Sequence, residues 1–336
     1  MNHHLDTPAL PRRRALQQLG ALSLTGAFGV RPAWAAIDAY PARALRIVVP
    51  YPPGAINDVL ARAIADRLTR PLGQAVIVDN KPGGNTIIGT QAVATAAPDG
   101  YTLLQVPASH AINAALNPRL PYDSIQDFSF ITLAARAPFL LVVHKDLPVR
   151  NVQELVAFAR KNPLACSYAS SGTGGNSHLM GELLNHLAGT RMLHVPYKGT
   201  TAAINDVIGG QVQCTFSTYS GASAALRSGR LRAIAVTSAQ RAQAFADIPT
   251  IAESGYPTYE AVGWWGFAAP AGTPQPILAR LRDEIAKACA APEFKQRLSA
   301  DAVEVVASTA DEFRRYLDKE IALWRGLSQK TRIQLD

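Results

Sequence analysis

The sequence has little cysteine: three residues in 336, with no C-x-x-C pair. A small, odd number of cysteines excludes the disulfide framework of a small secreted domain. We expect Cys166, Cys214 and Cys289 to be buried apolar thiols. A bridge between Cys166 and Cys214 on neighbouring strands is the alternative, which sequence spacing leaves open.

Basic runs with interleaved aromatic residues are also missing, although the formal net charge is +8. Lysine and arginine are instead scattered through amphipathic segments. This distribution argues against a nucleic-acid partner. The mild positive excess favours anionic small molecules as ligands.

The chain lacks the signatures of several enzyme classes. It has no Walker A loop, no G-x-G-x-x-G turn and no G-x-S-x-G elbow,. His178, Glu182 and His186 resemble metal spacing, but His186 is rotated away by roughly a quarter turn and no further ligand is indicated. We therefore predict no catalytic residue, no metal and no cofactor, with a periplasmic hydrolase as a remote alternative.

The N-terminal segment has the pattern of a secretory signal. Arg12, Arg13 and Arg14 precede an apolar run at 15–30, and Ala33 and Ala35 form an A-x-A cleavage signal,. Glutamines and glycines interrupt the run, which is too short for a stable anchor. We predict a signal peptide at 1–35, cleaved near Ala35, and a periplasmic protein. The arginines resemble a twin-arginine signal, and Sec export stays open. Without this segment the net charge is +5.

From residue 46 onward the pattern alternates between short apolar runs and amphipathic segments, as in parallel α/β proteins. We expect strands at 46–51, 75–79, 101–106, 139–143, 166–169, 192–195, 212–216 and 231–236. Helices are expected from Asp58 to about Gly73 and at 87–97, 152–160, 177–187 and 202–208. The chain divides into two lobes, with 36–138 and 264–336 in lobe 1 and 139–263 in lobe 2. Such lobes leave a ligand cleft between them.

The turn at 52–58 is the first candidate binding element. It joins a strand to a helix, so its unpaired N–H groups and the positive helix end suit a carboxylate. An ordinary turn with Asp58 as the cap is the alternative. The candidate residues at this turn are Tyr51, Gly54, Ala55, Ile56 and Asn57.

A second candidate loop, at 170–177, combines glycines with small hydroxyl side chains,. It resembles an anion cradle, and its candidate residues are Ser170, Ser171, Gly172, Thr173 and His178. Within the helix that follows, His178 is expected to be a capping or core histidine.

Further along the chain, Tyr197 and Lys198 follow a strand. Lys198 either attracts the ligand or lies on the solvated rim. Trp264 and Trp265 either contact an aromatic ligand or pack in the core beside a crossing between the lobes.

Several separate stretches together resemble one family. They are Arg46–Pro50, Pro53, Gly54 and Asp58, Asn80–Gly83, Pro98–Leu103, Ser170–Gly172, His178, Leu179, Val195–Gly199, Pro249–Glu253, Trp265, Gly266 and Pro270–Pro274. In these stretches, which cover nearly the whole mature chain, the sequence is similar to the Bug family. That family comprises the extracytoplasmic receptors of tripartite tricarboxylate transporters.

The resemblance implies a two-lobed, type II-like periplasmic binding protein with two parallel-rich α/β domains that close on a carboxylate. It implies that Gly54–Asn57 and Ser170–Thr173 hold one carboxylate from opposite lobes. Ser109 and Thr218 would lie near loops at the ligand's other end. It further implies a monomer that works with the membrane components of a tripartite transporter. A signalling module that docks on a membrane sensor is the alternative.

Two stretches depart from the family's pattern. Ala55 and Ile56 stand where a second glycine and a small polar residue are usual, and 85–87 replaces a more glycine-rich stretch. Because Ile56 places an apolar branched side chain in the pocket floor, we expect a ligand with an apolar or aromatic body beside its carboxylate.

Overall fold

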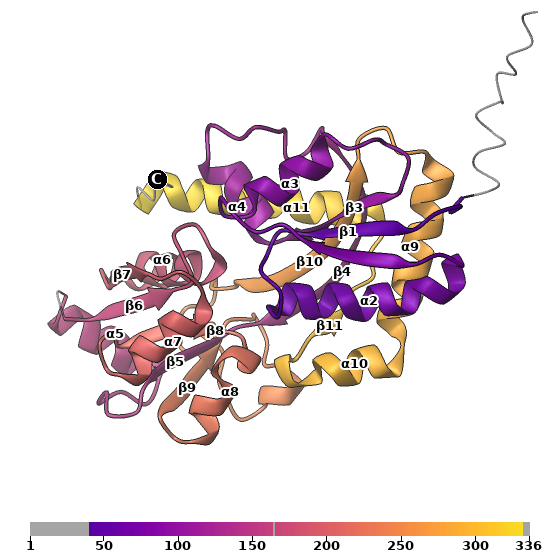
Figure 1. Ribbon diagram of the computed structural model, residues 1–336. Helices are drawn as coiled ribbons and strands as arrows, with labels where there is room; N and C mark the ends of the chain where they lie inside the picture. The colour runs from indigo at the N-terminus through magenta and orange to yellow at the C-terminus, as the bar shows by residue number, and fades with distance from the viewer. Residues whose placement is uncertain (1–39, 164, 332–336) are drawn as a thin grey trace, which may run out of the picture. The chain divides into compact units, whose positions relative to one another are not determined.

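The computed structural model describes residues 40–163 and 165–331, so the predicted signal peptide lies outside the described residues. In the compact unit that begins at Pro41, the described strands form two sheets (Figure 1). The six-stranded sheet has the order β11-β4-β10-β3-β1-β2, and the five-stranded sheet has the order β7-β6-β8-β5-β9.

In the six-stranded sheet, β1, β2 and β3 are parallel, and β10 runs antiparallel between β3 and β4. Its strands are β1 (Leu45–Val49), β2 (Val76–Asn80), β3 (Thr102–Pro107), β4 (Phe128–Pro138), β10 (Val262–Pro270) and β11 (Glu304–Val305). The helices of this part are α2 (Ile56–Leu72), α3 (Ile87–Ala94), α4 (Ser109–Leu116), α9 (Gln275–Ala290), α10 (Pro292–Leu298) and α11 (Ala310–Thr331).

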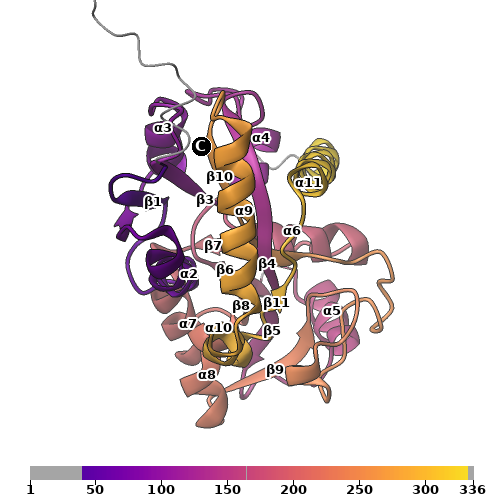
Figure 2. The same cartoon turned by 90° about the vertical axis from the view of Figure 1, so that its right-hand side faces the viewer.

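Apolar faces hold these helices on the sheet. Leu60, Ile64 and Leu68 recur every four residues along α2 and are fully buried, and the helix ends at Gly73 in the left-handed conformation, as the sequence predicts,. Helix α2 packs on α9, and α4 packs on α11 (Figures 1 and 2). Asp58 lies in the first turn of α2 and not at its N-cap, which is Ala55.

In the five-stranded sheet, β6, β7 and β8 are parallel, whereas β5 is antiparallel to both of its neighbours. Its strands are β5 (Leu140–His144), β6 (Ser167–Ser170), β7 (Leu193–Pro196), β8 (Cys214–Ser217) and β9 (Leu231–Val236). The helices of this part are α5 (Val152–Lys161), α6 (Asn176–Ala188), α7 (Thr200–Ile208), α8 (Tyr219–Arg227) and η1 (Gln243–Phe245), and η2 (Ser299–Asp301) follows α10. The two faces of β5 join different core clusters, because successive side chains point to opposite sides of a strand,.

The chain passes between the sheets at two places. Strand β4 ends at Pro138 and β5 begins at Leu140, and the segment after β9 returns to the six-stranded sheet as β10. The return is the one that the sequence indicates. The exact lobe boundaries, 138/139 and 263/264, stay a prediction.

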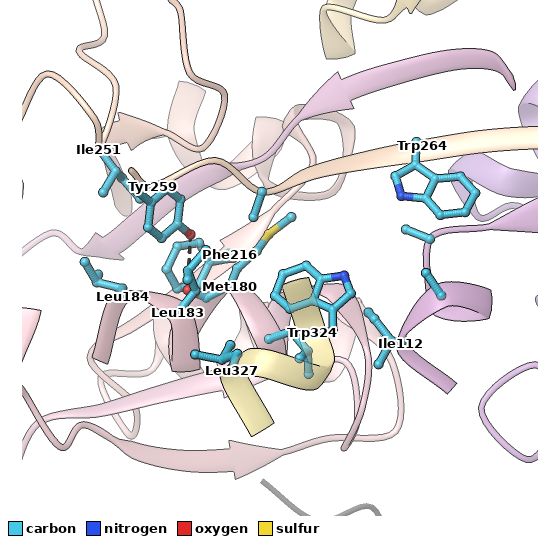
Figure 3. Packing of buried hydrophobic residues seen from close by; sticks show 14 of the residues in the cluster. Ile112, Met180, Leu183, Leu184, Phe216, Ile251, Tyr259, Trp264, Trp324 and Leu327 are labelled. Carbon is cyan, nitrogen blue, oxygen red and sulfur yellow. Dashed lines mark hydrogen bonds between the residues drawn. The ribbon is translucent and has the colours of Figure 1, made fainter. Parts of the chain in front are cut away.

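One apolar cluster continues from the first sheet to the second. Trp324 and Leu327 on α11 lie beside Met180 and Leu183 on α6 (Figure 3), and the two helices are in contact. Cys166, Cys214 and Cys289 are buried and unpaired, which confirms the expectation of apolar thiols. Between residues 40 and 331, no helix has the length and apolar character for crossing a bilayer.

Candidate functional site

The loops that follow the parallel strands gather at facing edges of the two sheets. Strands β1, β2 and β3 lead into α2, α3 and α4, and β6, β7 and β8 lead into α6, α7 and α8. Hydrogen bonds join the two sides: Asn85 Nδ2 donates to the Gly174 carbonyl at 3.2 Å, and the Ser220 N–H donates to Asp301 Oδ1 at 2.6 Å. Such edges are the usual ligand position in α/β proteins.

Asp58 organises the β1–α2 turn. Its carboxylate accepts hydrogen bonds from the Gly54 N–H at 2.9 Å and from Asn80 Nδ2 at 3.0 Å, and it pairs with Arg62. Burial alone would raise the pKa of Asp58, but the hydrogen bonds from Arg62, Gly54 and Asn80 hold it below its ordinary value,. Asp58 therefore anchors the turn as a carboxylate. It is not itself a group that would hold an anion.

The N-terminus of α2 keeps open donors. Its N-cap, Ala55, makes no side-chain cap. Within the described residues, the N–H groups of Ala55, Ile56 and Asn57 have no hydrogen-bond partner. The half-buried Ile56 is the first helical residue. An anion at this turn would meet unpaired donors and the positive end of a 17-residue helix,.

A polar network lies behind this turn. The Tyr51 hydroxyl donates to Ser109 Oγ at 3.2 Å, and Ser109 Oγ donates to Thr86 Oγ1 at 3.4 Å. Asn113 Nδ2 donates to Thr86 Oγ1 and to the Asn85 carbonyl. Ser109 is fully buried at the start of α4, so the structure places it behind Tyr51.

Sequence reasoning missed the part of this network that crosses between the sheets. Asn85 and Thr86 both have positive φ angles, 49° and 78°. For a β-branched threonine this backbone is strained, and such strain is found preferentially at functional sites. The signal was present in the sequence, because 85–87 is where the chain departs from the glycine-rich pattern.

The loop at 170–175 satisfies most of its own amides. The N–H groups of Ser171, Gly172 and Gly174 donate to Ser177 Oγ, Ser170 Oγ and His178 Nδ1, respectively. Ser170 is fully buried and its hydroxyl also lies 2.6 Å from His194 Nε2. Within the described residues, the Thr173 N–H has no partner. Ser170, Ser177 and His178 thus hold the loop in shape, and Thr173 is its open donor.

His178 and His194 stack behind this loop, with ring centroids 3.8 Å apart. Burial lowers the pKa of His178 to about 3, helped by His194, and lowers the pKa of His194 to about 4,. A neutral imidazole is needed for Nδ1 of His178 to accept the Gly174 N–H,. His178 is therefore a core histidine. Across residues 40–331, no group of three or more His, Cys, Asp or Glu side chains is placed to hold a metal.

The remaining candidate residues, Tyr197, Lys198 and Thr218, lie in the loops that follow β7 and β8. The Tyr197 N–H donates to the Ser170 carbonyl, and its hydroxyl donates to Asp206 at 2.6 Å, whereas Lys198 is exposed. Thr218 is the N-cap of α8, and its side chain accepts from the Gly221 N–H. The Thr218 side chain therefore caps the N-terminus of α8.

The two tryptophans lie in the core. Trp264 is 0% and Trp265 3% exposed, so the packing interpretation is confirmed. Among the described residues, none of the candidate loop residues lines the hollow of about 900 Å³, whose walls come from the crossings and from residues on either side of Asp301, such as Pro138, Val262 and Val303.

Comparison with known proteins identifies the family. The family model described as the tripartite tricarboxylate transporter family receptor, TctC, matches residues 60–333. A UPF0065 protein from Pseudomonas sp., found in the tcbD-tcbE intergenic region, is 35% identical over 329 residues, which is 98% of this chain and 97% of that protein. Protein BugT of Bordetella pertussis is 34% identical over 300 residues, covering 89% of this chain and 92% of BugT.

Solved structures agree with these relatives. The periplasmic binding protein BugD superposes with a TM-score of 0.79 at 34% identity, covering 88% of this chain and 99% of BugD. An R. palustris protein with adipate gives 0.81 at 33% identity over 88% of this chain and 99% of its own. MatC from Rhodopseudomonas palustris with bound malate gives 0.77 at 29% identity over 86% and 99%. The expected two-lobed periplasmic-binding-protein fold is thus confirmed, and the chain belongs to the TctC/Bug family of periplasmic solute-binding receptors.

Proposed function

We propose that this chain captures a small carboxylate between its two sheets and delivers it to the membrane components of a tripartite tricarboxylate transporter. The family supports this function, since its members are substrate-binding receptors and not enzymes. Two similar structures hold adipate and malate, both of which are dicarboxylates.

The observation that carries the proposal is the open N-terminus of α2. Asp58 fixes the Gly54 loop, while Ala55, Ile56 and Asn57 keep unpaired N–H groups among the described residues. A ligand carboxylate would accept hydrogen bonds from these groups and be stabilised by the helix dipole. No proton transfer or covalent step is needed, and the ligand leaves unchanged.

The opposite sheet would supply the second contact. The Thr173 N–H is open within the described residues, and its loop is tied to the six-stranded sheet by the Asn85–Gly174 hydrogen bond. A carboxylate bound to both sides would favour the closed arrangement, because only that arrangement offers both sets of donors.

The body of the ligand would be apolar. Ile56 is half-buried at the turn, and Ile88 in the first turn of α3 is 56% exposed. These side chains would pack against an aliphatic or aromatic group at little desolvation cost. A citrate-like polyacid would gain nothing from them.

The first test is a ligand screen on chain from which bound solute has been removed by unfolding and refolding. A ligand that binds only the native state raises the melting temperature. We expect one class of carboxylates to raise it and to be recovered unchanged, with benzoate-type acids ahead of citrate. Consumption of the compound would instead indicate an enzyme.

A matched pair of variants tests the α2 donors. Ile56→Ala and Ile56→Pro both remove the branched isoleucine side chain, but only proline removes the N–H, and proline is well tolerated at the first position of a helix. We expect the proline variant to bind the carboxylate at least about tenfold more weakly than the alanine variant, at similar melting temperature. Equal affinities would rule out the Ile56 N–H as a ligand donor.

Export and delivery need separate tests. We predict that the exported protein begins near residue 36, is found in the periplasm and is a monomer, which mass spectrometry, fractionation and size-exclusion chromatography measure. Deletion of the gene should abolish uptake of the identified carboxylate. Intact uptake with a lost transcriptional response would favour the signalling alternative.

A further inference from the structure

We propose that this receptor selects monocarboxylates over dicarboxylates, because Asp301 already occupies the helix end where a second carboxylate would bind. The inference rests on the function proposed above and specifies its substrate class. It starts from one juxtaposition, the Asp301 carboxylate against the N-terminus of α8.

Helix α8 differs from the other helices that begin at the facing edges. In the described part of the chain, α2, α3, α4, α6 and α7 begin without a side-chain cap. In α8, Thr218 Oγ1 accepts from the Gly221 N–H, the Thr218 carbonyl accepts from the Ala222 N–H, and Asp301 Oδ1 accepts from the Ser220 N–H. These three N–H groups in the first turn of α8 are therefore already hydrogen-bonded within the protein.

Asp301 and α8 belong to different parts of the protein. Asp301 belongs to η2, which follows α10 of the six-stranded part, whereas α8 belongs to the five-stranded part. The Asp301 side chain is buried, with 5% of the residue exposed. No basic side chain of the described residues forms an ion pair with it. Its partner is the positive end of α8, as it would be for a bound anion.

The topology brings this helix end next to the candidate loop at 170–173. Strands β6 and β8 pair in parallel, so the loop at 170–173 and the start of α8 follow neighbouring strands. Neighbouring strands are about 4.8 Å apart. A carboxylate held near Thr173 would thus need only a few methylene groups to bring a second carboxylate to α8.

Asp301 disfavours that second carboxylate in two ways. The Ser220 N–H is already used. The negative charge of Asp301 also repels a like charge in a partly desolvated site. A monocarboxylate with an apolar tail meets neither obstacle.

The experiment measures dissociation constants calorimetrically for two probe pairs that differ by one carboxylate, hexanoate against adipate and benzoate against terephthalate. The full chain is stripped of bound solute beforehand. We expect the monoacid of at least one pair to bind at least about tenfold more tightly than its diacid.

Three variants locate the cause. Asp301→Ala frees the Ser220 N–H and removes the charge, so the preference for the monoacid should fall about tenfold or reverse. Asp301→Asn keeps an acceptor oxygen but removes the charge, and should give an intermediate ratio. Asp283→Asn, an exposed acid on α9, makes the same charge change and should leave the ratio as in the parent chain.

The ratio separates selectivity from structure. Loss of the contact between the two parts would weaken both members of a pair alike, and only a selective role changes their ratio. Equal or tighter binding of diacids by the parent chain, or an unchanged ratio in Asp301→Ala, would overturn the proposal while leaving a carboxylate receptor. If neither these probes nor any other carboxylate binds, the proposed function itself fails.

Discussion

Trp264 on β10 donates its indole N–H to Oε2 of Glu320 on α11 at 3.0 Å, and the indole of Trp324 donates to the same oxygen at 3.3 Å. One half-buried acid therefore satisfies two buried indoles. Burial raises the pKa of Glu320, although both indole hydrogen bonds oppose the rise,. Trp264 thus stands beside the crossing as a packed and hydrogen-bonded residue.

Replacing Glu320 by alanine should destabilise the fold. Two buried N–H groups would lose their acceptor, and each unsatisfied group costs about 1–3 kcal/mol. Glu320→Gln keeps an acceptor oxygen and should cost about 1 kcal/mol or less. Urea unfolding followed by tryptophan fluorescence measures both. Similar losses in the two variants would contradict the role of the shared oxygen.

Gly266 should tolerate no side chain. A Cβ at this position would overlap the ring of Phe313, which packs against β10 from α11. We expect Gly266→Ala to lower the free energy of unfolding by about 1–3 kcal/mol. Gly326→Ala on α11 is the control, because its Cβ would meet nothing within 4 Å and alanine favours a helix by about 1 kcal/mol,. A neutral Gly266→Ala would mean that Phe313 can move aside.

Asn85 should control closure. Its amide donates to Gly174 across the site, and its φ of 49° suits glycine,. Asn85→Gly keeps the backbone and loses the donor, so we expect ligand affinity to fall about fivefold with little change in melting temperature. X-ray scattering of the ligand-free variant should give a larger radius of gyration. Unchanged affinity and radius would show that this hydrogen bond does not set the closed population.

The free energy of unfolding should fall as the pH drops from about 6.5 to 4.5. Burial lowers the pKa of His110 to about 4 and that of His178 to about 3, so both stay neutral in the folded chain while the unfolded chain takes up protons,. Each contributes a slope of at most about 1.4 kcal/mol per pH unit. Their contribution is fully present above the unfolded pKa of about 6.5 and is lost below it.

Glu320 acts in the opposite direction, since its raised pKa makes the folded chain bind a proton more readily,. The slope is therefore best measured as the difference between the parent chain and His110→Gln, in which the contribution of Glu320 cancels. The variant should show the shallower slope. An identical slope would mean that His110 is already protonated, or accessible, in the folded state.

Much of the secondary structure follows from local pattern. The helices at 152–160 and 177–187 and the strand at 231–236 were expected within one or two residues of α5, α6 and β9, because their apolar spacing is strong,. Helix α4 and the 11-residue strand β4 were missed. Strand β4 is almost continuously buried, so it shows no alternation of polar and apolar residues. Helix α4 begins without a side-chain cap, so the sequence has no clear start signal there. Helix α8 was missed because most of its residues are small, although Thr218 is a good N-cap.

The parts of the site that lie within a single turn could be predicted from the sequence. The parts formed by residues far apart in the sequence could not. The turn at Gly54 and the loop at Ser171 stand out as glycine-containing strand-to-helix junctions. The pairing of Asp301 with Ser220 joins residues 81 positions apart, and the Asn85–Gly174 pair spans 89. Only the folded arrangement brings such partners together. Asp301 belongs to no motif, so the sequence alone gives no sign of its role.

The contact between α11 and α6 ties the end of the chain to the middle of it. Since the last helix packs on the six-stranded sheet through Phe313 and on α6 through Trp324, neither sheet can melt without exposing apolar surface of the other. We therefore expect one cooperative unfolding transition, with calorimetric and van't Hoff enthalpies in agreement, in a protein built from two lobes.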